Sequence, residues 1–479
     1  MTQPEEIKLF SYDEISRFTI SDVHDLYRQF VNPGQVEFLA SFGPGRVLAD
    51  SAAGNKIHCR DGRVIYDFTG GVGVLNHGHN HPEILEVRKR FQSGNRMEVH
   101  KNFLSPYVAG LSANIAALMP GDLKMSYFCN SGAEAVEGAV KLAYKVYNGR
   151  RARLMAADIS FHGKLLGSAG LTGSPEVPFA WPSIPNIDRF VYNDLQRVKD
   201  LVEKNRLPGG ESGHYCILVE PFSASSLREC DTEFLRGLRE LCDREDIVLV
   251  FDEVYTGWAK TGALFNCFHH QVTPDILAMS KSFGAGKASI AGYVTRTPVF
   301  TRAYGKLNDS IMHSTTYNGF GEECVTASEG IRIMVRDKYC EKARAMEAAL
   351  KPRLLKLAGE TGGFITEVRG RGGLLGCLFN DQVNPALKAA LSVLPSDFVR
   401  DGRFIAKLVT GSVISELFNK HNILTYFGSN REIPLVIAPP LITAREDLDY
   451  FADSLESVLR QGRLKLVAKY IAYKYGGKV

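Results

Sequence analysis

The chain has 479 residues, a length that suits two domains better than one compact core. Hydrophobic residues make up 45% and charged residues 23%, an ordinary globular balance that argues against disorder. The formal net charge of +4 is small for this length, so composition gives no reason to expect nucleic acid as a partner. No apolar run approaches the ~18 residues that a membrane span requires, and the first residues, MTQPEE, show no secretory signal.

Nine cysteines are scattered along the chain, and no two of them have a CxxC spacing. An odd and unpatterned set does not suggest a disulfide framework. We therefore expect a cytoplasmic protein in which the cysteines are small, mostly buried side chains.

The first two thirds of the chain alternate short apolar strands with helices. Residues 1–65 are predicted to form an N-terminal arm and part of a small domain, and they include an amphipathic segment at 15–30. Residues 66–320 are predicted to form the large domain, with a helix at 133–147 and strands at 124–129, 154–158, 216–221, 247–254 and 290–294. This pattern is typical of an α/β fold in which helices cover both faces of a mostly parallel sheet.

The last third, residues 321–479, predicts a smaller α+β domain. Its expected elements are helices at 325–358, 404–419 and 446–460 and strands at 373–379 and 423–427. The tail, 463–479, is basic and amphipathic. The apolar face of this tail could bind a membrane surface or pack against the body of the protein. Packing against the body is favoured because many surface helices have this pattern.

Two charged residues follow neighbouring apolar segments in the large domain. Asp252 ends the apolar run 247–251, and Lys281 ends the apolar run 276–279 and is followed by glycines. Open α/β sheets bind their ligands at such strand ends. A lysine amine can form an imine with an aldehyde cofactor, and a carboxylate can keep a pyridine nitrogen protonated. Alone, either residue would indicate little, since such an Asp is usually a helix cap and such a Lys is usually solvated.

Two further segments fit the same kind of site. Ser131, Gly132 and Ala133 lie at a strand-to-helix junction, where a hydroxyl and backbone N–H groups can hold an anion at the positive end of the helix. Phe161 and His162 follow another strand, and an aromatic ring there can stack on a flat cofactor. Taken singly, the first segment would be an ordinary N-cap and Phe161 a core residue.

In order and spacing, these motifs resemble the class III (ω-type) aminotransferases, which are fold type I pyridoxal-phosphate enzymes. The resemblance runs from about residue 32 to 459 and includes Gly70-Gly71, the Asn-Ser-Gly-Ala-Glu-Ala segment, Glu220-Pro221, Asp252-Glu253-Val254 and Pro439-Pro440-Leu441. The putrescine (diamine) aminotransferase branch is the most similar. The resemblance implies pyridoxal 5′-phosphate as cofactor, small amine and carbonyl compounds as substrates, and a homodimer with shared sites.

The resemblance also implies a role for each matching residue. Lys281 would carry the cofactor and move a proton, and Asp252 would pair with the pyridine nitrogen. Phe161 and Val254 would enclose the ring, Ser131, Gly132 and Ala133 would hold the phosphate, and Glu220 and His162 would belong to the cofactor's surroundings. Thr316, or Thr315 beside it, would reach the phosphate of the other subunit, and Tyr255 stands where the family has a glutamine, so its hydroxyl could bond the ring oxygen. Two other lysines compete with Lys281 for the imine role. Lys260 stands where the family usually has an arginine, and Lys287 lies in a glycine-rich loop and not at a strand end.

Two departures from the family pattern bear on the substrate. Members often carry an arginine that grips an α-carboxylate three residues before Pro-Pro-Leu, where this chain has Val436. They also often carry a glutamate that masks this arginine, where this chain has Ser225. A guanidinium–carboxylate clamp is strong in a dry site, so its loss changes substrate preference. We expect at least one substrate without an α-carboxylate.

Other readings of the same residues remain open. The scaffold could support an aminomutase, a racemase or a decarboxylase, because fold does not fix chemistry. A relative that binds without catalysis is disfavoured by the intact pair of Asp252 and Lys281. The histidines at 77, 79 and 81 could suggest a metal site, but they have no partner at ligand spacing, so we expect no metal.

Overall fold

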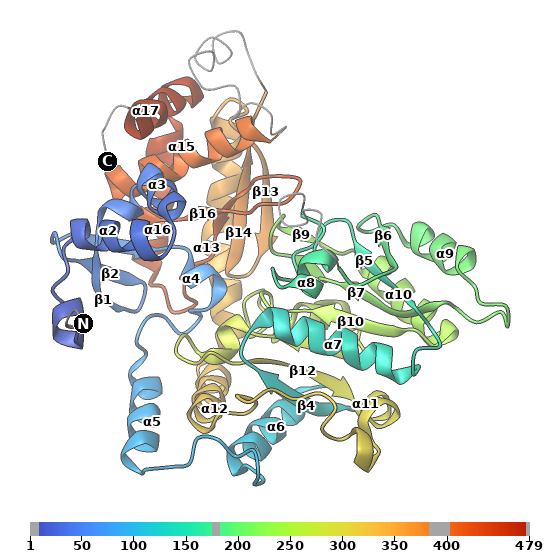
Figure 1. Cartoon of the computed structure of the whole chain (residues 1–479). Coiled ribbons are helices and arrows are strands. Elements are labelled where there is room, and N and C mark those ends of the chain that lie inside the picture. The colour runs from blue at the N-terminus through green and yellow to red at the C-terminus, as the bar shows by residue number, and fades with distance from the viewer. Residues whose placement is uncertain (1–8, 175–182, 383–402, 476–479) are drawn as a thin grey trace, which may run out of the picture.

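The computed structural model describes residues 9–174, 183–382 and 403–475. A seven-stranded sheet forms the centre of the larger part of the molecule (Figure 1). Its strands, in spatial order, are β4 (Leu123–Cys129), β12 (Ala291–Arg296), β11 (Ile276–Met279), β10 (Val248–Asp252), β7 (His214–Val219), β5 (Arg153–Ala157) and β6 (Ile187–Phe190). β12 runs antiparallel to both of its neighbours, and the other six strands run in one direction. The predicted mostly parallel sheet is therefore confirmed.

Alternate residues of each strand belong to two different hydrophobic cores. In β10, Leu249 and Phe251 pack into one core, and Val248 and Val250 pack into the other. Successive side chains of a strand point to opposite faces, so the sheet is covered on both sides. One face packs against α7 (Gly132–Val146) and α11 (Thr297–Tyr304), and the other packs against α6 (Pro106–Leu118), α9 (Leu195–Lys204), α10 (Thr232–Glu245) and α12 (Gly321–Arg336).

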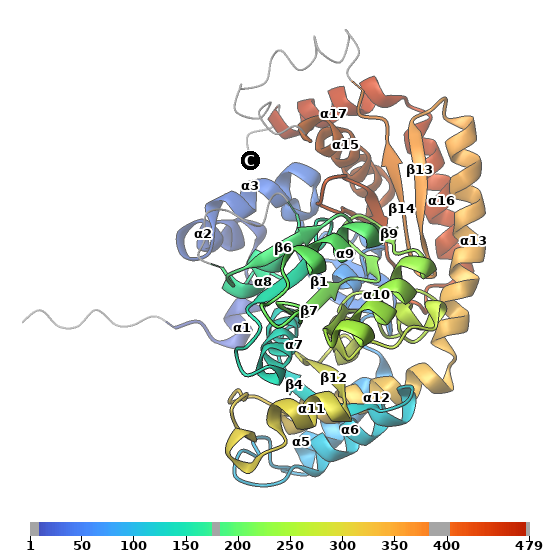
Figure 2. The same cartoon turned by 90° about the vertical axis from the view of Figure 1, so that its right-hand side faces the viewer.

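A second, antiparallel sheet lies in the C-terminal part of the chain. It consists of β13 (Ile365–Arg371), β14 (Leu374–Phe379), β17 (Leu435–Ile437) and β16 (Tyr426–Phe427). Its helices are α13 (Tyr339–Glu360), α15 (Phe404–His421), α16 (Arg445–Leu459) and α17 (Arg463–Tyr475). Figure 2 shows α13 as a long helix along the outer edge of the molecule, beside this sheet.

The N-terminal residues join this C-terminal part through a third sheet, made of β1 (Ala49–Ala53), β2 (Lys56–Cys59), β3 (Val64–Asp67) and β15 (Ile423–Leu424). β3 and β15 pair in parallel, with Tyr66 beside Ile423. The remaining elements are the strands β8 (Phe222–Ser223) and β9 (Arg228–Glu229), the 3₁₀ turns η1 (Pro44–Arg46), η2 (Asn266–His270), η3 (Lys281–Gly284) and η4 (Leu307–Asp309), and the helices α1 (Tyr12–Ile15), α2 (Ile20–Phe30), α3 (Pro33–Phe42), α4 (Gly70–Gly73), α5 (Pro82–Ser93) and α8 (Leu166–Leu171).

Two predicted elements were wrong in their extent. The helix expected at 325–358 is two helices, because Lys338 adopts a left-handed backbone conformation between α12 and α13. The strand expected at 423–427 is also two strands: β15 pairs with β3, and β16 pairs with β17 in the other sheet. The apolar pattern was right in both places, but it does not report where the backbone turns.

The basic tail forms α17 up to Tyr475, and its last residues, 476–479, lie outside the described part. Its apolar face packs against α15 and α3, where Tyr470 stacks on Phe42 with ring centroids 5.7 Å apart. The guanidinium of Arg46 lies 4.0 Å from the ring centroid of Tyr473. Packing against the body, the favoured alternative, is therefore confirmed.

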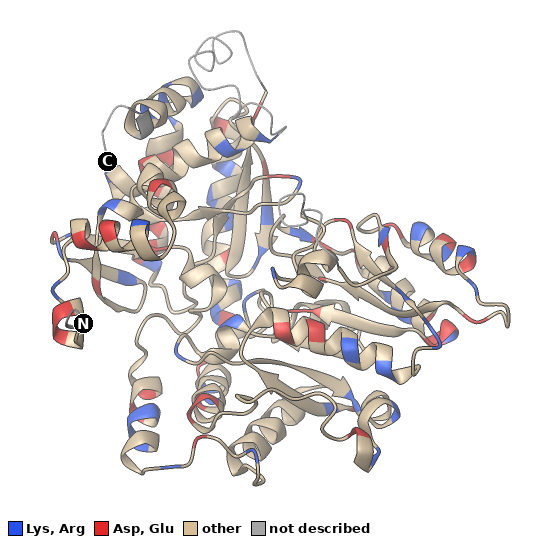
Figure 3. Cartoon of the chain, in the orientation of Figure 1, with Lys and Arg blue, Asp and Glu red and all other residues tan. Residues whose placement is uncertain are grey.

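Charges of both signs are mixed along the outer helices (Figure 3). On α7, Glu134 and Glu137 lie near the start and Lys141 and Lys145 lie nearer the end, the arrangement that the helix dipole favours. Within the described residues, no helix is both long enough and apolar enough to cross a membrane.

Candidate active site

Three ionisable side chains meet at the carboxyl edge of the central sheet. Glu220 follows β7, Asp252 ends β10, and Lys281 follows β11. These strands are parallel neighbours, and Asp252 pairs in register with Ala278 of β11. Their carboxyl ends therefore open at one place, as the sequence predicted from the order of strands.

Asp252 is held by two donors. Nδ1 of His162 lies 2.7 Å from Oδ2 of Asp252, and the backbone N–H of Val254 donates to Oδ1 over 3.0 Å. Both side chains of the histidine–aspartate pair are buried. The other ring nitrogen of His162, Nε2, is buried and has no hydrogen-bond partner within the described chain.

Glu220 is a second buried carboxyl group beside Asp252. Its Oε2 accepts the backbone N–H of Phe161 over 2.8 Å, which fixes the segment that carries the aromatic ring. Burial, and then the negative charge of Asp252, raise the pKa of Glu220 well above its usual range. The carboxyl of Glu220 therefore keeps its proton to a higher pH than an exposed glutamate does.

Lys281 stands at the start of η3 with φ +48, a left-handed conformation that is strained for a lysine. Such strain persists only where the surroundings enforce it, and it is concentrated at functional sites. Burial lowers the pKa of Lys281, and the charges of Asp252 and Glu220 oppose this effect. A lowered pKa leaves more of the neutral amine, which is the form that attacks a carbonyl carbon.

The start of α7 lies close to these groups. A Cβ at Gly132 would meet Cγ1 of Val254 at 2.8 Å, so the backbone approaches the segment after β10 more closely there than a side chain allows. Ser131 is the N-cap of α7, and its hydroxyl donates to Oε2 of Glu134 over 2.9 Å. Gly132 and Ala133 line the cavity at this edge, and Ser131 is not among its lining residues.

That cavity has a volume of about 470 Å³. Most of the residues predicted for the site line it, namely Gly132, Ala133, Phe161, His162, Glu220, Asp252, Val254, Tyr255 and Lys281. Sequence reasoning missed several other lining residues, namely Val72, Lys164, Ala224, Ser280 and the stretch 426–429. Val72, which follows Gly70-Gly71 and has φ +59, is the one for which the sequence held a signal.

The departures from the family pattern occupy different places. Val436 is fully buried in an apolar cluster with Phe222 and Leu374 and does not line the cavity. Ser225 lines the cavity and accepts a hydrogen bond from Nδ2 of Asn430 over 2.9 Å. The hydroxyl of Tyr255 is hydrogen-bonded to the hydroxyl of Tyr426.

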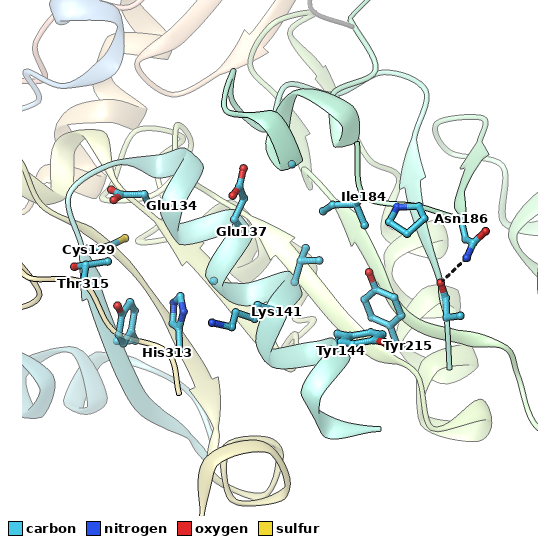
Figure 4. Close-up of a pocket in the computed structure, with 16 residues that line it drawn as sticks. Cys129, Glu134, Glu137, Lys141, Tyr144, Ile184, Asn186, Tyr215, His313 and Thr315 are labelled. Atoms are coloured by element: carbon cyan, nitrogen blue, oxygen red, sulfur yellow. Dashed lines mark hydrogen bonds between the residues drawn. The ribbon is translucent and has the colours of Figure 1, made fainter. Parts of the chain in front are cut away.

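A second cavity, of about 590 Å³, lies along α7, with the segment that precedes α12 on one side and Ile184, Asn186 and Tyr215 on the other (Figure 4). Glu137, Lys141 and Tyr144 line it from α7, and His313 and Thr315 line it from the segment before α12. Thr315 is therefore separated from the Lys281 cavity, and Thr316 is exposed.

The other candidate lysines and histidines lie outside the residues that line the Lys281 cavity. Lys260 is fully buried, and its Nζ donates to the carbonyl of Pro439 over 3.1 Å. Lys287 is exposed. Nε2 of His77 lies 2.9 Å from the carbonyl oxygen of Gly330, and Nε2 of His79 lies 2.9 Å from Oδ2 of Asp67.

The donor set fits a phosphorylated pyridine aldehyde. One cavity brings together an amine, a carboxylate with a histidine behind it, an aromatic ring and the backbone of a helix start. The family profile described as aminotransferase class-III matches residues 42–459. The chain belongs to the class III aminotransferases. As a member of this family, it is an enzyme that transfers amino groups with pyridoxal 5′-phosphate as its cofactor.

Relatives of this aminotransferase are similar over nearly its whole length. It is 30% identical to a putrescine aminotransferase of Pectobacterium atrosepticum over 92% of the chain and 89% of that protein. It is 27% identical to the aminotransferase PigE of a Serratia strain over 91% of the chain, but it spans only 53% of that longer protein.

Solved structures confirm the predicted fold of this aminotransferase. A transaminase from the marine bacterium Virgibacillus superposes with a TM-score of 0.78 at 20% identity and covers 92% of this chain and 98% of its own. Ornithine aminotransferase from Toxoplasma gondii superposes with a TM-score of 0.77 at 20% identity and covers 95% of this chain and 99% of its own.

Proposed function

We propose that this aminotransferase moves an amino group between an amine and a carbonyl compound, at least one of which lacks an α-carboxylate. The observation that carries this proposal is the composition of the Lys281 cavity. It holds two carboxyl groups, the buried amine of Lys281 and, at an exposed position, the amine of Lys164, and no arginine is found among the described residues that line it. A substrate carboxylate would therefore meet Asp252 and Glu220 without a guanidinium to offset them.

Lys281 and Asp252 are the proposed catalytic residues. When bound, the cofactor supplies a ring that accepts electrons from the substrate carbon. The neutral amine of Lys281 Nζ takes the proton from that carbon and returns it, a role that its lowered pKa supports. Asp252, oriented by His162 and by the N–H of Val254, would pair with the ring nitrogen.

The other predicted residues are assigned to binding. Phe161 and Val254 would enclose the ring, and the N–H groups of Gly132 and Ala133 would hold the phosphate. Ser131 would support them as the N-cap of α7. Glu220 would hold Phe161 in place by accepting its backbone N–H.

The cavity walls favour an uncharged or amine-bearing chain. Val72, Ala224, Tyr426 and Phe427 are apolar or aromatic lining residues, and Val436 belongs to the buried apolar cluster against which Tyr426 packs. The similarity to a putrescine aminotransferase supports the same substrate class, because putrescine is a diamine without a carboxylate. A reduced, cytoplasmic setting is proposed because all nine cysteines are free.

We also propose a homodimer, in which Thr316 or Thr315 would reach the partner's phosphate. Two segments expose large apolar side chains: Leu104 is 100% exposed and Phe103 68%, and Leu307 is 89% exposed and Ile311 81%. Large apolar side chains that are exposed in the single chain are typical of an interface.

Borohydride reduction of the holoenzyme, followed by peptide mass spectrometry, tests the site. We expect the cofactor on the peptide that contains Lys281. The Lys281→Ala variant should lose this adduct, and Lys287→Ala, the matched control, should keep it. An adduct on Lys260 or Lys287 in the native protein would exclude the assignment.

A single-turnover screen tests the substrate class. Diamines and alkylamines should discharge the absorbance of the lysine-bound cofactor faster than α-amino acids do. If only α-amino acids react, the proposal about the missing carboxylate clamp is wrong. The transfer reaction itself is tested by whether free glutamate or alanine forms from a keto acid acceptor.

A further inference from the structure

The ring of Tyr255 lies against the amine of Lys281. Nζ of Lys281 is 4.5 Å from the centroid of this ring. Tyr255 follows Asp252 on the loop after β10 and lines the same cavity. An ammonium within about 6 Å of an aromatic face is attracted by the ring quadrupole, and the attraction is larger where water is excluded.

Three independent contacts hold this ring in one place. Its hydroxyl is bonded to the hydroxyl of Tyr426, which belongs to β16 in the C-terminal sheet. Gly73 supports the ring from the other part of the chain: a Cβ at Gly73 would lie 2.6 Å from Cζ of Tyr255. The apolar cluster around the ring contains Phe222, Ala224, Leu227, Leu374, Val436 and Ala438.

The phenol remains neutral in this position. Burial, and then the neighbouring Tyr426, raise the pKa of Tyr255 well above its usual value. The hydroxyl is already bonded to Tyr426, so the face of the ring, and not the oxygen, is what Tyr255 presents to the amine.

The charged groups around the amine come from several elements. Asp252 and Glu220 attract it from β10 and from the loop after β7, and His162 acts on it through Asp252. Lys164, an exposed residue that also lines the cavity, adds a positive charge. Tyr255 is the uncharged group that approaches the amine with an aromatic face.

We propose that Tyr255, fixed by its bond to Tyr426, is a positioning residue that holds the Lys281 amine by its ring face. The inference rests on the proposed role of Lys281. It replaces the expectation that the Tyr255 hydroxyl bonds the cofactor, and it links the strand β16 to the reacting lysine through two aromatic side chains.

The test separates the ring from its hydroxyl. Tyr255→Phe keeps the ring and loses the hydroxyl, Tyr255→Leu loses both, and Tyr426→Phe removes only the partner hydroxyl. Tyr339→Leu is the matched control, because Nζ of Lys342 lies 4.6 Å from the ring centroid of Tyr339, a residue that does not line the cavity.

Two measurements are made on each holoenzyme. The first is the pH midpoint of the absorbance of the lysine-bound cofactor, and the second is kcat and KM for an alkylamine. The ring stabilises the protonated nitrogen, so Tyr255→Leu should move the midpoint to lower pH, and Tyr255→Phe should leave it near that of the native protein. Tyr255→Leu should lower kcat by about tenfold to a hundredfold with little change in KM, since a misplaced reacting group costs rate.

Each outcome decides the question. If Tyr255→Leu has the native midpoint, or if Tyr255→Phe shifts it as far as Tyr255→Leu does, the inference is wrong. If Tyr255→Leu does not fold, Tyr426→Phe decides: a lower kcat at a native midpoint supports the positioning role, and an unchanged kcat overturns it. If borohydride does not label Lys281 in the native protein, the proposed function fails instead.

Discussion

The imidazole of His162 and the carboxylate of Asp252 form a buried pair, with Nδ1 2.7 Å from Oδ2. The pair joins the segment after β5 to the end of β10, two strands that β7 separates in the sheet. Asp252 therefore keeps one orientation toward the cavity whatever is bound there. Partners that orient a functional group in this way usually matter almost as much as the group itself.

Removing this histidine should weaken cofactor binding. His162→Ala deletes one of the two donors to Asp252, and a buried hydrogen bond to a charged group is worth about 1.5–3 kcal/mol. We expect the cofactor dissociation constant to rise by about tenfold or more, measured by absorbance titration of the apoprotein. His270→Ala is the control, because His270 forms a similar pair with Glu229 (3.1 Å) outside the cavity. Equal affinities for His162→Ala and the native protein would contradict the prediction.

Lys260 should make stability depend on pH. Burial lowers its pKa to about 7 from 10.5, and the charge of Asp67 only partly offsets this. Between these two values the unfolded chain binds more protons than the folded one, so stability should rise with pH across this window and be lowest below pH 7.

Lys260→Met should remove this contribution. The difference in unfolding free energy between the native protein and Lys260→Met should change with pH. It should shift in favour of the native protein by up to ~1.4 kcal/mol per pH unit between pH 7 and 9. Chemical denaturation at three pH values measures the difference. Lys356→Met, at a largely exposed site on α13, should give parallel profiles, and parallel profiles for Lys260→Met would refute the argument.

The backbone conformation of Lys338, between α12 and α13, lowers the stability of the fold. Its φ of +54 is unfavourable for any residue with a Cβ, and its side chain is 69% exposed. Lys338→Gly should therefore raise the unfolding free energy by about 0.5–1 kcal/mol. The same change at Lys356, inside α13, should lower it by about 1 kcal/mol. Thermal unfolding compares the two, and a loss of stability at position 338 would count against the explanation.

Leu104 should control assembly. It is fully exposed in the single chain, so Leu104→Asp should not disturb folding. In a dimer that buries it, the aspartate would place an unpaired charge in the interface. Light scattering should show monomers for Leu104→Asp and dimers for Val191→Asp, a control at another exposed apolar residue. A dimeric Leu104→Asp variant would place the interface elsewhere.

Much of the central sheet could be predicted from the sequence, because β7, β10 and β11 are uninterrupted apolar runs that end in polar residues. The proximity of Asp252 and Lys281 could also be predicted, because parallel neighbouring strands have their carboxyl ends at the same edge of the sheet. β6 was missed, since Ile187-Asp188-Arg189-Phe190 carries two charges that bond to side chains and carbonyls of neighbouring segments.

The far side of the cavity could not be predicted. Tyr426 lies there because β16 pairs with Val436 and Leu435, a contact that no local pattern encodes. The hydrogen bond between Tyr255 and Tyr426 depends on this pairing. The partner of the Tyr255 hydroxyl could therefore not be predicted from the sequence. Val72 enters the cavity through a left-handed turn between glycines, which a periodicity argument does not detect.

The pairing of β3 with β15 also orders events during synthesis. Tyr66 is synthesised hundreds of residues before Ile423, the residue of β15 that pairs with it. Asp67, at the end of β3, accepts the N–H groups of Thr69 and Gly70 and so shapes the turn that presents Val72 to the cavity. The cavity wall that Val72 shares with residues 426–429 is complete only after the C-terminal strands emerge, and pairing across such a separation is slow. A nascent chain that already holds the whole central sheet would therefore still lack a finished cavity wall.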